Sequence, residues 1–329
     1  MSAEPLIAPV PGAAAMAPPA WNCGLLAVDK PTGVTSHDVV ERVRRRLRIR
    51  RAGHLGTLDP GASGLLLVAL GPATRCAAVW QGGQKLYEGT VRFGVVTSTQ
   101  DLDGEVLERS DAWPAAAAIR GGAAALVGEI EQIPPMASAV HVGGERLYRM
   151  HRRGETIERA PRRVTVHSWE WIEFAPPDAR FRVRCSGGTY VRTLAHDLGA
   201  RLGCGATLAA LRRLESSPFS IERSVPLNEV LNGPPEAAWA GAGYSLERAL
   251  AHLPSLTLDR AEADTVGFGR QPLVDAARAG AAPLAAGPRS IVLLDAAGLA
   301  LGLGELETQD GSTLRVCPHV LFPWAVRER

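Results

Sequence analysis

Residues 51–70 read RAGHLGTLDPGASGLLLVAL, a glycine-rich loop that runs directly into an apolar segment. The glycines and Pro60 predict an exposed bend, and the apolar residues 64–70 predict a buried strand behind it. Asp59 lies in this bend beside Pro60 and Gly61, where a carboxylate can reach a ligand. The same spacing also fits an aspartate that only caps a turn, so the loop alone leaves a functional and a structural interpretation open.

The segments on either side of this loop predict a mixture of strands and helices. Upstream, residues 24–28 form an apolar run, and Ser36 stands where the N-cap of a helix over residues 37–47 belongs. Further along, strands are expected at residues 85–93, 105–107, 163–174 and 180–186, and helices at 113–126, 191–202 and 208–214. These elements do not alternate as regular strand–helix–strand units, so we expect an α+β fold with a mostly antiparallel mixed sheet flanked by helices and loops.

Composition divides the chain into three parts. Residues 1–21 are rich in proline and alanine and predict a disordered tail, because they bury too little apolar surface to become ordered. A main domain is expected over residues 22–251, with an arginine-rich insertion at about residues 133–162. Residues 252–329 predict a small β-rich domain with strands at 290–294, 302–305 and 313–316, and with a flexible loop at 276–288.

The composition and the cysteine pattern exclude several classes of protein. The 329 residues are 46% hydrophobic and 21% charged, which is typical of a folded globular chain and not of a disordered or fibrous one. The apolar runs are too short or too rich in proline to cross a membrane, and no charged start precedes them, so a cytoplasmic protein is expected. Five cysteines without a C-x-x-C pair predict free thiols and no metal site. The spacings of a dinucleotide site, a P-loop and a hydrolase nucleophile elbow do not occur, so no nucleotide cofactor is expected.

Two further features are candidates for chemistry. Arg192 falls in the first turn of the helix expected at 191–202, where the helix dipole disfavours a cation, so we expect an anionic partner such as Asp59. Such a pair would lower the pKa of the carboxyl and keep it ionised. The alternative is a solvated surface arginine. In the strand expected at residues 85–93, Tyr87 shares a face with Lys85. An aromatic ring beside basic groups can stack on a nucleobase, although a tyrosine packed in the core is the commoner outcome.

Several motifs occur in order along the chain: VDKPTGVTS at residues 28–36, RAGHLGTLDPGASG at 51–64, KLY at 85–87, TSTQDLDG at 97–104, CSGGTYVR at 185–192 and LRRL at 211–214. Together they resemble the bacterial tRNA pseudouridine synthase B (TruB) family, which converts uridine 55 in the T-loop of tRNA to pseudouridine. The resemblance covers roughly residues 22–323. The chain departs from the family's common pattern at Leu55, Gly61 and Ser63, positions that bear on the stiffness of the loop and not on its carboxylate.

The resemblance implies a pseudouridine synthase fold and a role for each matching residue. Asp59 matches the catalytic aspartate, Tyr87 the tyrosine that stacks on the flipped uracil, and Arg192 the arginine that pairs with the aspartate. Leu211 matches a residue that packs against the base, and His54 matches the histidine that fills the space left by nucleotides leaving the loop. The other substrate-binding residues expected on this ground are Asp101, Lys30, Tyr190 and Arg75.

The resemblance also implies the partners. Pseudouridine formation adds no outside group and involves no redox step, so no cofactor is expected. The implied substrate is tRNA, held at its T-arm and T-loop, with the insertion at 133–162 closing on the RNA and a PUA-like C-terminal domain touching the acceptor stem side. The arginines between residues 42 and 51 are expected to neutralise phosphates. We expect a monomer without an obligatory protein partner and without membrane contact. Two alternatives stay open, namely an RNA-folding chaperone and a synthase that acts on ribosomal or guide-directed RNA.

Overall fold

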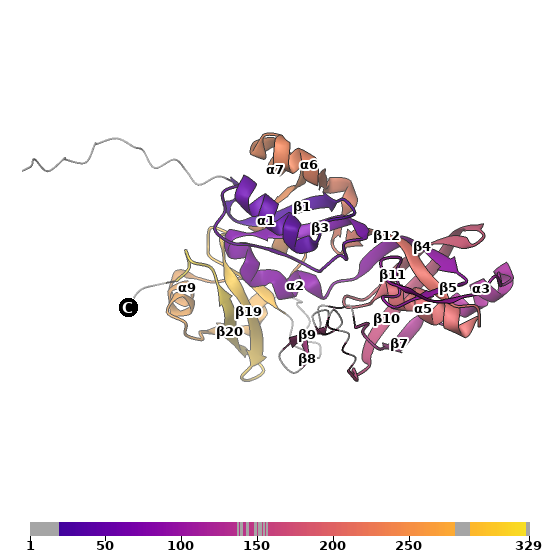
Figure 1. Cartoon of the computed structure of the whole chain (residues 1–329). Coiled ribbons are helices and arrows are strands. Elements are labelled where there is room, and N and C mark those ends of the chain that lie inside the picture. The colour runs from indigo at the N-terminus through magenta and orange to yellow at the C-terminus, as the bar shows by residue number, and fades with distance from the viewer. Residues whose placement is uncertain are drawn as a thin grey trace, which may run out of the picture.

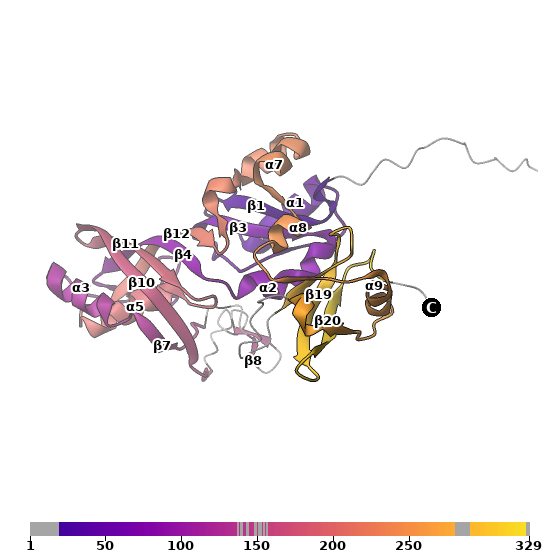
Figure 2. The same cartoon turned by 180° about the vertical axis from the view of Figure 1, so that it is seen from behind.

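The computed structural model describes residues 20–136, 157–279 and 290–326, and between the first two ranges residues 138, 141–142, 145–147, 150, 153 and 155. The disordered tail expected at 1–21 and the flexible loop expected at 276–288 therefore lie largely outside the described residues. The insertion expected at 133–162 lies outside them only in part. Figures 1 and 2 show a large part built on one long sheet, with a smaller C-terminal part beside it.

The long sheet has eleven strands and is mixed. Along its main path the strands are β14 (Val225–Pro226), β1 (Gly24–Lys30), β3 (Ala62–Leu70), β12 (Ala206–Ser216), β4 (Lys85–Phe93), β11 (Asp178–Cys185), β10 (Arg162–Ala175) and β7 (Gly128–Gln132). Three short strands pair at its sides: β2 (Ala52–His54), β13 (Phe219–Ser220) and β15 (Gly243–Ser245). The β1–β14 and β3–β12 pairs are parallel, and the other pairs are antiparallel. The predicted α+β fold with a mostly antiparallel mixed sheet is confirmed.

Helices and two hairpins surround this sheet. The helices are α1 (Ser36–Arg46), α2 (Ala77–Gln81), α3 (Ala116–Ala124), α5 (Val191–Arg201), α6 (Leu227–Asn232), α7 (Pro235–Ala242) and α8 (Leu246–Leu250), with 3-10 turns η1 (Ala20–Asn22), η2 (Gly71–Cys76) and η3 (Ile221–Arg223). The hairpins are β5 (Val95–Thr97) with β6 (Val106–Arg109), and β8 (His141–Val142) with β9 (Glu145–Arg146). Within the described ranges, no helix is long and apolar enough to span a membrane.

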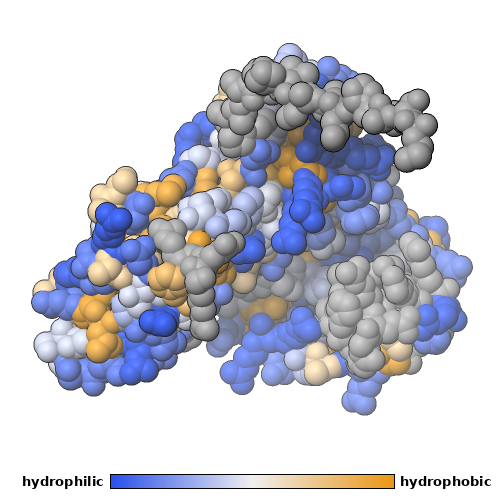
Figure 3. All heavy atoms as spheres, turned by 90° about the vertical axis from the view of Figure 1, so that its left-hand side faces the viewer, coloured by the Kyte–Doolittle hydropathy of each residue, from blue (hydrophilic) through white to orange (hydrophobic). Residues whose placement is uncertain are grey.

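Strand position explains the burial patterns of β3 and β4. Residues 64–70 of β3 are all buried, because this strand lies between β1 and β12 in the interior of the sheet. In β4 every second residue is buried, so Lys85 and Tyr87 share the inner face, as their spacing predicts. On the face shown in Figure 3 the surface is mostly hydrophilic, with small separate hydrophobic areas, which is usual for a folded protein.

The start of α1 differs from its prediction by one residue. Thr35, not Ser36, is the N-cap, and it forms a capping box with Asp38. Ser36 is buried instead, and its hydroxyl accepts a hydrogen bond from the Leu58 N–H at 2.8 Å and donates one to the Leu58 carbonyl at 2.9 Å. The serine therefore ties the beginning of α1 to the residue before Asp59.

The helix predicted at residues 208–214 is wrong, because this segment belongs to β12. Leu208, Leu211 and Leu214 are spaced by three, which imitates a helical face. In the structure two irregularities interrupt the pairing of β12 with β4, one between Leu208 and Ala210 and one between Arg213 and Glu215. Each irregularity inserts one extra residue into β12 and so shifts which residues face which side of the sheet. A strand with such bulges can carry apolar residues three positions apart, which a regular strand would place on opposite faces.

In its described residues, the smaller part has a five-stranded sheet and the helix α9 (Arg260–Gly267). In spatial order its strands are β16 (Ser255–Thr257), β18 (Ile291–Leu294), β19 (Ala300–Thr308), β20 (Thr313–Leu321) and β17 (Leu273–Asp275), accompanied by α9 and the turn η4 (Ala276–Ala279). It has its own apolar core. It also packs on the main core, because Leu303 and Phe322 belong to the larger apolar cluster.

Candidate active site

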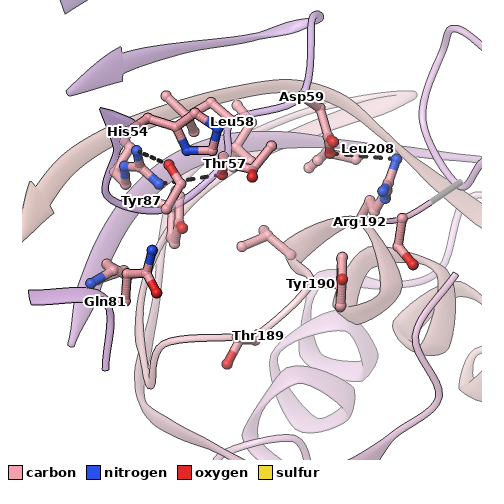
Figure 4. A pocket seen from close by; sticks show the side chains of 17 residues that line it. His54, Thr57, Leu58, Asp59, Gln81, Tyr87, Thr189, Tyr190, Arg192 and Leu208 are labelled. Atoms are coloured by element: carbon pink, nitrogen blue, oxygen red, sulfur yellow. Dashed lines mark hydrogen bonds and ion pairs between the residues drawn. The ribbon is translucent and has the colours of Figure 1, made fainter. Parts of the chain in front are cut away.

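The Asp59 loop opens onto a cavity of about 350 Å³ (Figure 4). The cavity is bounded by the loop between β2 and β3, by the inner face of β4, by β12 and by the start of α5. Six of the nine site residues expected from the sequence line it, namely His54, Asp59, Tyr87, Tyr190, Arg192 and Leu211. The loop, strands and helix thus bring together residues more than a hundred positions apart.

Arg192 stands between two carboxylates. Its guanidinium lies 3.4 Å from an Asp59 carboxylate oxygen and 3.1 Å from one of Asp101, and in Figure 4 the side chains of Asp59 and Arg192 point toward one another. Arg192 is almost fully buried, whereas 42% of the Asp59 side chain remains exposed to the cavity. The structure thus contains the ion pair between Arg192 and Asp59 that the sequence predicts. Asp101, which is expected to bind substrate, forms the second ion pair of Arg192.

Hydrogen bonds hold both ends of this arrangement. The Asp101 carboxylate accepts a hydrogen bond from the Thr99 hydroxyl at 2.5 Å. At the start of α5, the buried Gln132 side chain accepts from the Tyr190 N–H at 2.7 Å and donates to the Tyr190 carbonyl at 3.0 Å. Two residues further along, Arg192 is therefore presented from a fixed helix terminus.

Burial raises the pKa of Asp59 above its ordinary value, and this effect is larger than any other. Arg192 lowers the pKa of the same carboxyl, whereas the negative charge of Asp101 raises it. The sequence-based expectation that Arg192 favours the ionised form is right in direction. It is incomplete in outcome, because desolvation exceeds the attraction and the pKa stays raised.

Lys30 supports the loop from beneath and does not line the cavity. Its side chain is fully buried, and its amine donates to the carbonyls of Pro31 at 2.9 Å, Val34 at 2.8 Å and Pro60 at 3.4 Å. Burial lowers the pKa of Lys30 to about 8. The structure thus places the ammonium against backbone carbonyls of the Asp59 loop, where it positions the loop.

Arg213 is a site residue that sequence reasoning missed. It is fully buried opposite Tyr87, donates to the carbonyls of Leu65 at 2.7 Å and Gly56 at 3.1 Å, and hydrogen-bonds the Tyr87 hydroxyl. It therefore fixes the Asp59 loop and the tyrosine ring at once. The available signal was its place in the LRRL motif, two residues after Leu211 and so on the same face of a strand. The wrong helix assignment concealed it.

Arg75 does not belong to this cavity. It lies in η2, and its guanidinium donates a hydrogen bond to the Leu321 carbonyl at the end of β20. A substrate contact of Arg75 would therefore lie away from the Asp59 cavity.

The five cysteines are free thiols, as predicted. In the part of the chain that the structure describes, no three His, Cys, Asp or Glu side chains are grouped to hold a metal ion.

Comparison with known proteins matches this arrangement to one family. Residues 44–191 match the N-terminal domain of the TruB family of pseudouridylate synthases, and residues 192–249 match the tRNA pseudouridylate synthase B C-terminal domain. The chain belongs to the TruB family. It is therefore a pseudouridylate synthase, an isomerase, and the resemblance seen in its motifs is confirmed.

Relatives with the curated name tRNA pseudouridine synthase B extend over most of the chain. The protein of Aromatoleum aromaticum is 42% identical over 284 residues, 86% of this chain and 89% of its own length. That of Opitutus terrae is 50% identical over 208 residues, 63% of this chain and 86% of its own length. Among solved structures, one described as a Cbf5-Nop10-Gar1 complex superposes with a TM-score of 0.71 at 26% identity, covering 93% of this chain and 88% of the matched one. This TruB chain thus has the fold of a pseudouridine synthase over nearly its whole length.

Proposed function

We propose that this enzyme converts uridine 55 in the T-loop of tRNA to pseudouridine and that Asp59 is its catalytic carboxylate. The observation that carries the proposal is the ion pair of Asp59 with the buried Arg192 at the edge of a cavity of about 350 Å³. The names of its relatives support tRNA as the substrate.

The reaction explains why the carboxylate has to be ionised. Pseudouridine formation breaks the bond from ribose C1′ to uracil N1, turns the base and joins C1′ to C5. C5 then loses its proton and N1 gains one, either the same proton or one exchanged with solvent. Attack by Asp59 on C1′, attack on C6 and abstraction of a ribose proton all start from the charged carboxylate. Arg192 lowers the pKa of Asp59 and so increases its ionised fraction in a site that otherwise disfavours charge.

The cavity also has the apolar surface that an extruded base needs. A base stacked inside an RNA loop reaches an enzyme pocket only by flipping out, which costs a few kcal/mol. Tyr87 and Leu211 line the cavity, and in our proposal they replace the lost stacking on the uracil. The Arg192 guanidinium lies over the Tyr190 ring, 5.8 Å from its centre. Tyr190 therefore adds a second aromatic ring to the cavity wall beside Asp59 and Arg192.

The remaining parts of the chain complete the proposed assembly. We assign residues 22–251 to a catalytic domain, residues 133–162 to a segment that closes on the T-arm, and residues 252–329 to a PUA-like RNA-binding domain. The enzyme works on tRNA as a monomer in this proposal and uses no cofactor.

An assay with a T-arm hairpin tests the assignment of Asp59. Asp59→Asn is expected to abolish pseudouridine formation while its affinity for the hairpin stays within a few fold. Asp103→Asn is the matched control, because it removes a second carboxylate close to Asp59. The charge of Asp103 raises the pKa of Asp59, but among the described residues Asp103 forms no ion pair with Arg192. Normal product formation by Asp59→Asn would rule out its catalytic role.

Two outcomes would favour the alternatives. Product formation too slow to matter in cells, with unimpaired refolding of tRNA, would favour a chaperone. In a strain lacking the gene, loss of pseudouridine from ribosomal RNA with position 55 of tRNA intact would favour another RNA substrate.

A further inference from the structure

A second cavity, of about 590 Å³, lies where the large part of the molecule meets the C-terminal part. Its walls are residues 48–51 after α1, residues of η2, and Pro323 and Trp324 after β20. No residue of the Asp59 cavity lines it, so the two are separate sites. Its volume is within the range of about 300–1,000 Å³ that is usual for ligand pockets.

The cavity is strongly basic. Four exposed arginines line it, namely Arg48, Arg50, Arg51 and Arg75, and among the described lining residues none is acidic. Within the described ranges none of the four has an ion-pair partner, whereas Arg44 of the neighbouring helix pairs with Glu41 at 2.8 Å. Four cations that share one opening repel each other, and a polyanion relieves that repulsion.

Hydrogen bonds brace the segments that carry these arginines. Arg48 follows the end of α1 with φ at 55°, in the left-handed region where glycine is the usual residue. The Ile49 N–H donates to the Arg44 carbonyl at 3.0 Å, so Arg48 takes the left-handed position that commonly ends a helix. The Gly71 N–H donates to the Arg51 carbonyl at 2.8 Å, and Arg75 donates to the Leu321 carbonyl. The walls of the cavity are therefore braced against one another.

An aromatic ring stands beside the arginines. Trp324 is 37% exposed, stacks on the buried Phe322 at 5.0 Å between ring centres, and donates from its indole nitrogen to the Ala300 carbonyl at 2.7 Å. The ring is thus held rigidly by its stacked face and its N–H. A rigid, partly exposed aromatic ring among arginines is a typical site for an unpaired nucleobase and its phosphates.

We propose that this cavity is a second RNA site, where Trp324 stacks on an unpaired nucleotide and the arginines Arg48, Arg50, Arg51 and Arg75 neutralise the phosphates beside it. This rests on the proposed function, because the RNA is the same tRNA whose T-loop nucleotide enters the Asp59 cavity. The nucleotide at Trp324 then belongs to a part of the tRNA outside the T-arm. In this proposal Arg75 binds substrate, as expected from the sequence, but in the second cavity and not in the Asp59 cavity.

Equilibrium binding to two RNAs tests the site. The dissociation constants of a whole tRNA transcript and of an isolated T-arm hairpin are measured over a series of salt concentrations. The variants are the double replacement Arg50→Gln with Arg51→Gln, the single replacement Trp324→Ala, and Trp324→Phe, which keeps an aromatic ring. The control is Arg260→Gln with Arg270→Gln, which removes the same charge from exposed residues of the C-terminal part outside the cavity.

We expect the arginine double variant to bind whole tRNA at least tenfold more weakly, with a salt slope lower by about 2, since each lost phosphate contact removes about 1. Trp324→Ala is expected to lose about fivefold or more, with recovery in Trp324→Phe. Hairpin binding should change by less than twofold in every variant.

Equal weakening by the control pair would show that only overall charge matters, and equal weakening toward the hairpin would place these arginines on the T-arm. Either result overturns the proposal. If Trp324→Ala loses its fold, the arginine variant and Trp324→Phe still decide. Because the readout is affinity and not product, a failure of the catalytic assignment leaves this result interpretable.

Discussion

Replacing Arg192 by glutamine removes the positive charge beside Asp59 and keeps a side chain of similar shape. If the guanidinium aims and ionises the carboxylate, the chemical step should suffer and RNA binding should not. Arg201→Gln is the matched control, because Arg201 is exposed at the other end of the same helix α5. Both variants keep the start of the helix, so its fixation by Gln132 is unchanged.

The separation of the two charges gives the size of the effect. At 3.4 Å two unit charges attract by about 1 kcal/mol in water and about 5 kcal/mol at an effective dielectric constant near 20. The Asp59 side chain is 42% exposed, so water screens the pair until substrate fills the cavity. We therefore expect a loss of about 1.5 to 4 kcal/mol, or about 10-fold to 10³-fold in kcat/KM.

Single-turnover rates on the T-arm hairpin at several pH values measure this loss and its cause. Arg192 lowers the pKa of Asp59, so its removal should move the acid limb of the rate profile to higher pH. Asp101→Asn should move that limb to lower pH, because the charge of Asp101 raises the same pKa. An acid limb that stays in place in Arg192→Gln, or a loss of affinity equal to the loss of rate, would refute this account.

Three further outcomes follow from the loop and its supports. Gly64→Ala should lower the melting temperature markedly, because φ is +100° there and a Cβ would lie 2.3 Å from the Arg213 carbonyl oxygen of β12. Gly61→Ala should not, because its Cβ would lie 3.3 Å from the nearest atom, an Asp103 carboxylate oxygen. The lowered pKa of Lys30, about 8 instead of 10.5, means that the unfolded chain binds its proton more tightly, so native stability should rise between these pH values and rise less in Lys30→Met. The pKa of Asp59 is raised in the folded protein, so its effect on stability is opposite to that of Lys30: ionisation of Asp59 lowers stability as pH rises. Asp59→Asn should therefore melt at a higher temperature than the native protein at neutral pH, and the difference should vanish in acid. A lower melting temperature of this variant at neutral pH would contradict the account.

The sequence predicted those elements whose periodicity survives in the sheet. The strand at 85–93 has the predicted bounds, and α5 (Val191–Arg201) ends one residue before the prediction. The strand β12 (Ala206–Ser216) was mistaken for a helix because two bulges change its period, and bulges depend on the partner strand β4. A single sequence has no record of that partner.

The candidate site divides in the same way. Residues that present their side chains to the cavity stand in recognisable motifs, so Asp59, Tyr87 and Arg192 were predictable. The functions of Lys30 and Arg213 were not, because both side chains bind backbone carbonyl groups whose positions depend on the folded loop. No residue type marks a carbonyl as needing a donor, since every residue has one.

The cations Lys30, Arg213 and Arg192 lie around the Asp59 loop, and their contacts divide them between two tasks. Lys30 and Arg213 are fully buried and donate to backbone carbonyls, so their charges act mainly on the geometry of the loop. Arg192 contacts carboxylates, and one of them, Asp101, holds it beside the other. Because a buried arginine between two carboxylates is electrically satisfied without the substrate, it has little charge left to attract RNA phosphate. Attraction of the polyanion then has to come from exposed arginines elsewhere, which is why the site for chemistry and the sites for RNA affinity are expected to respond to different mutations.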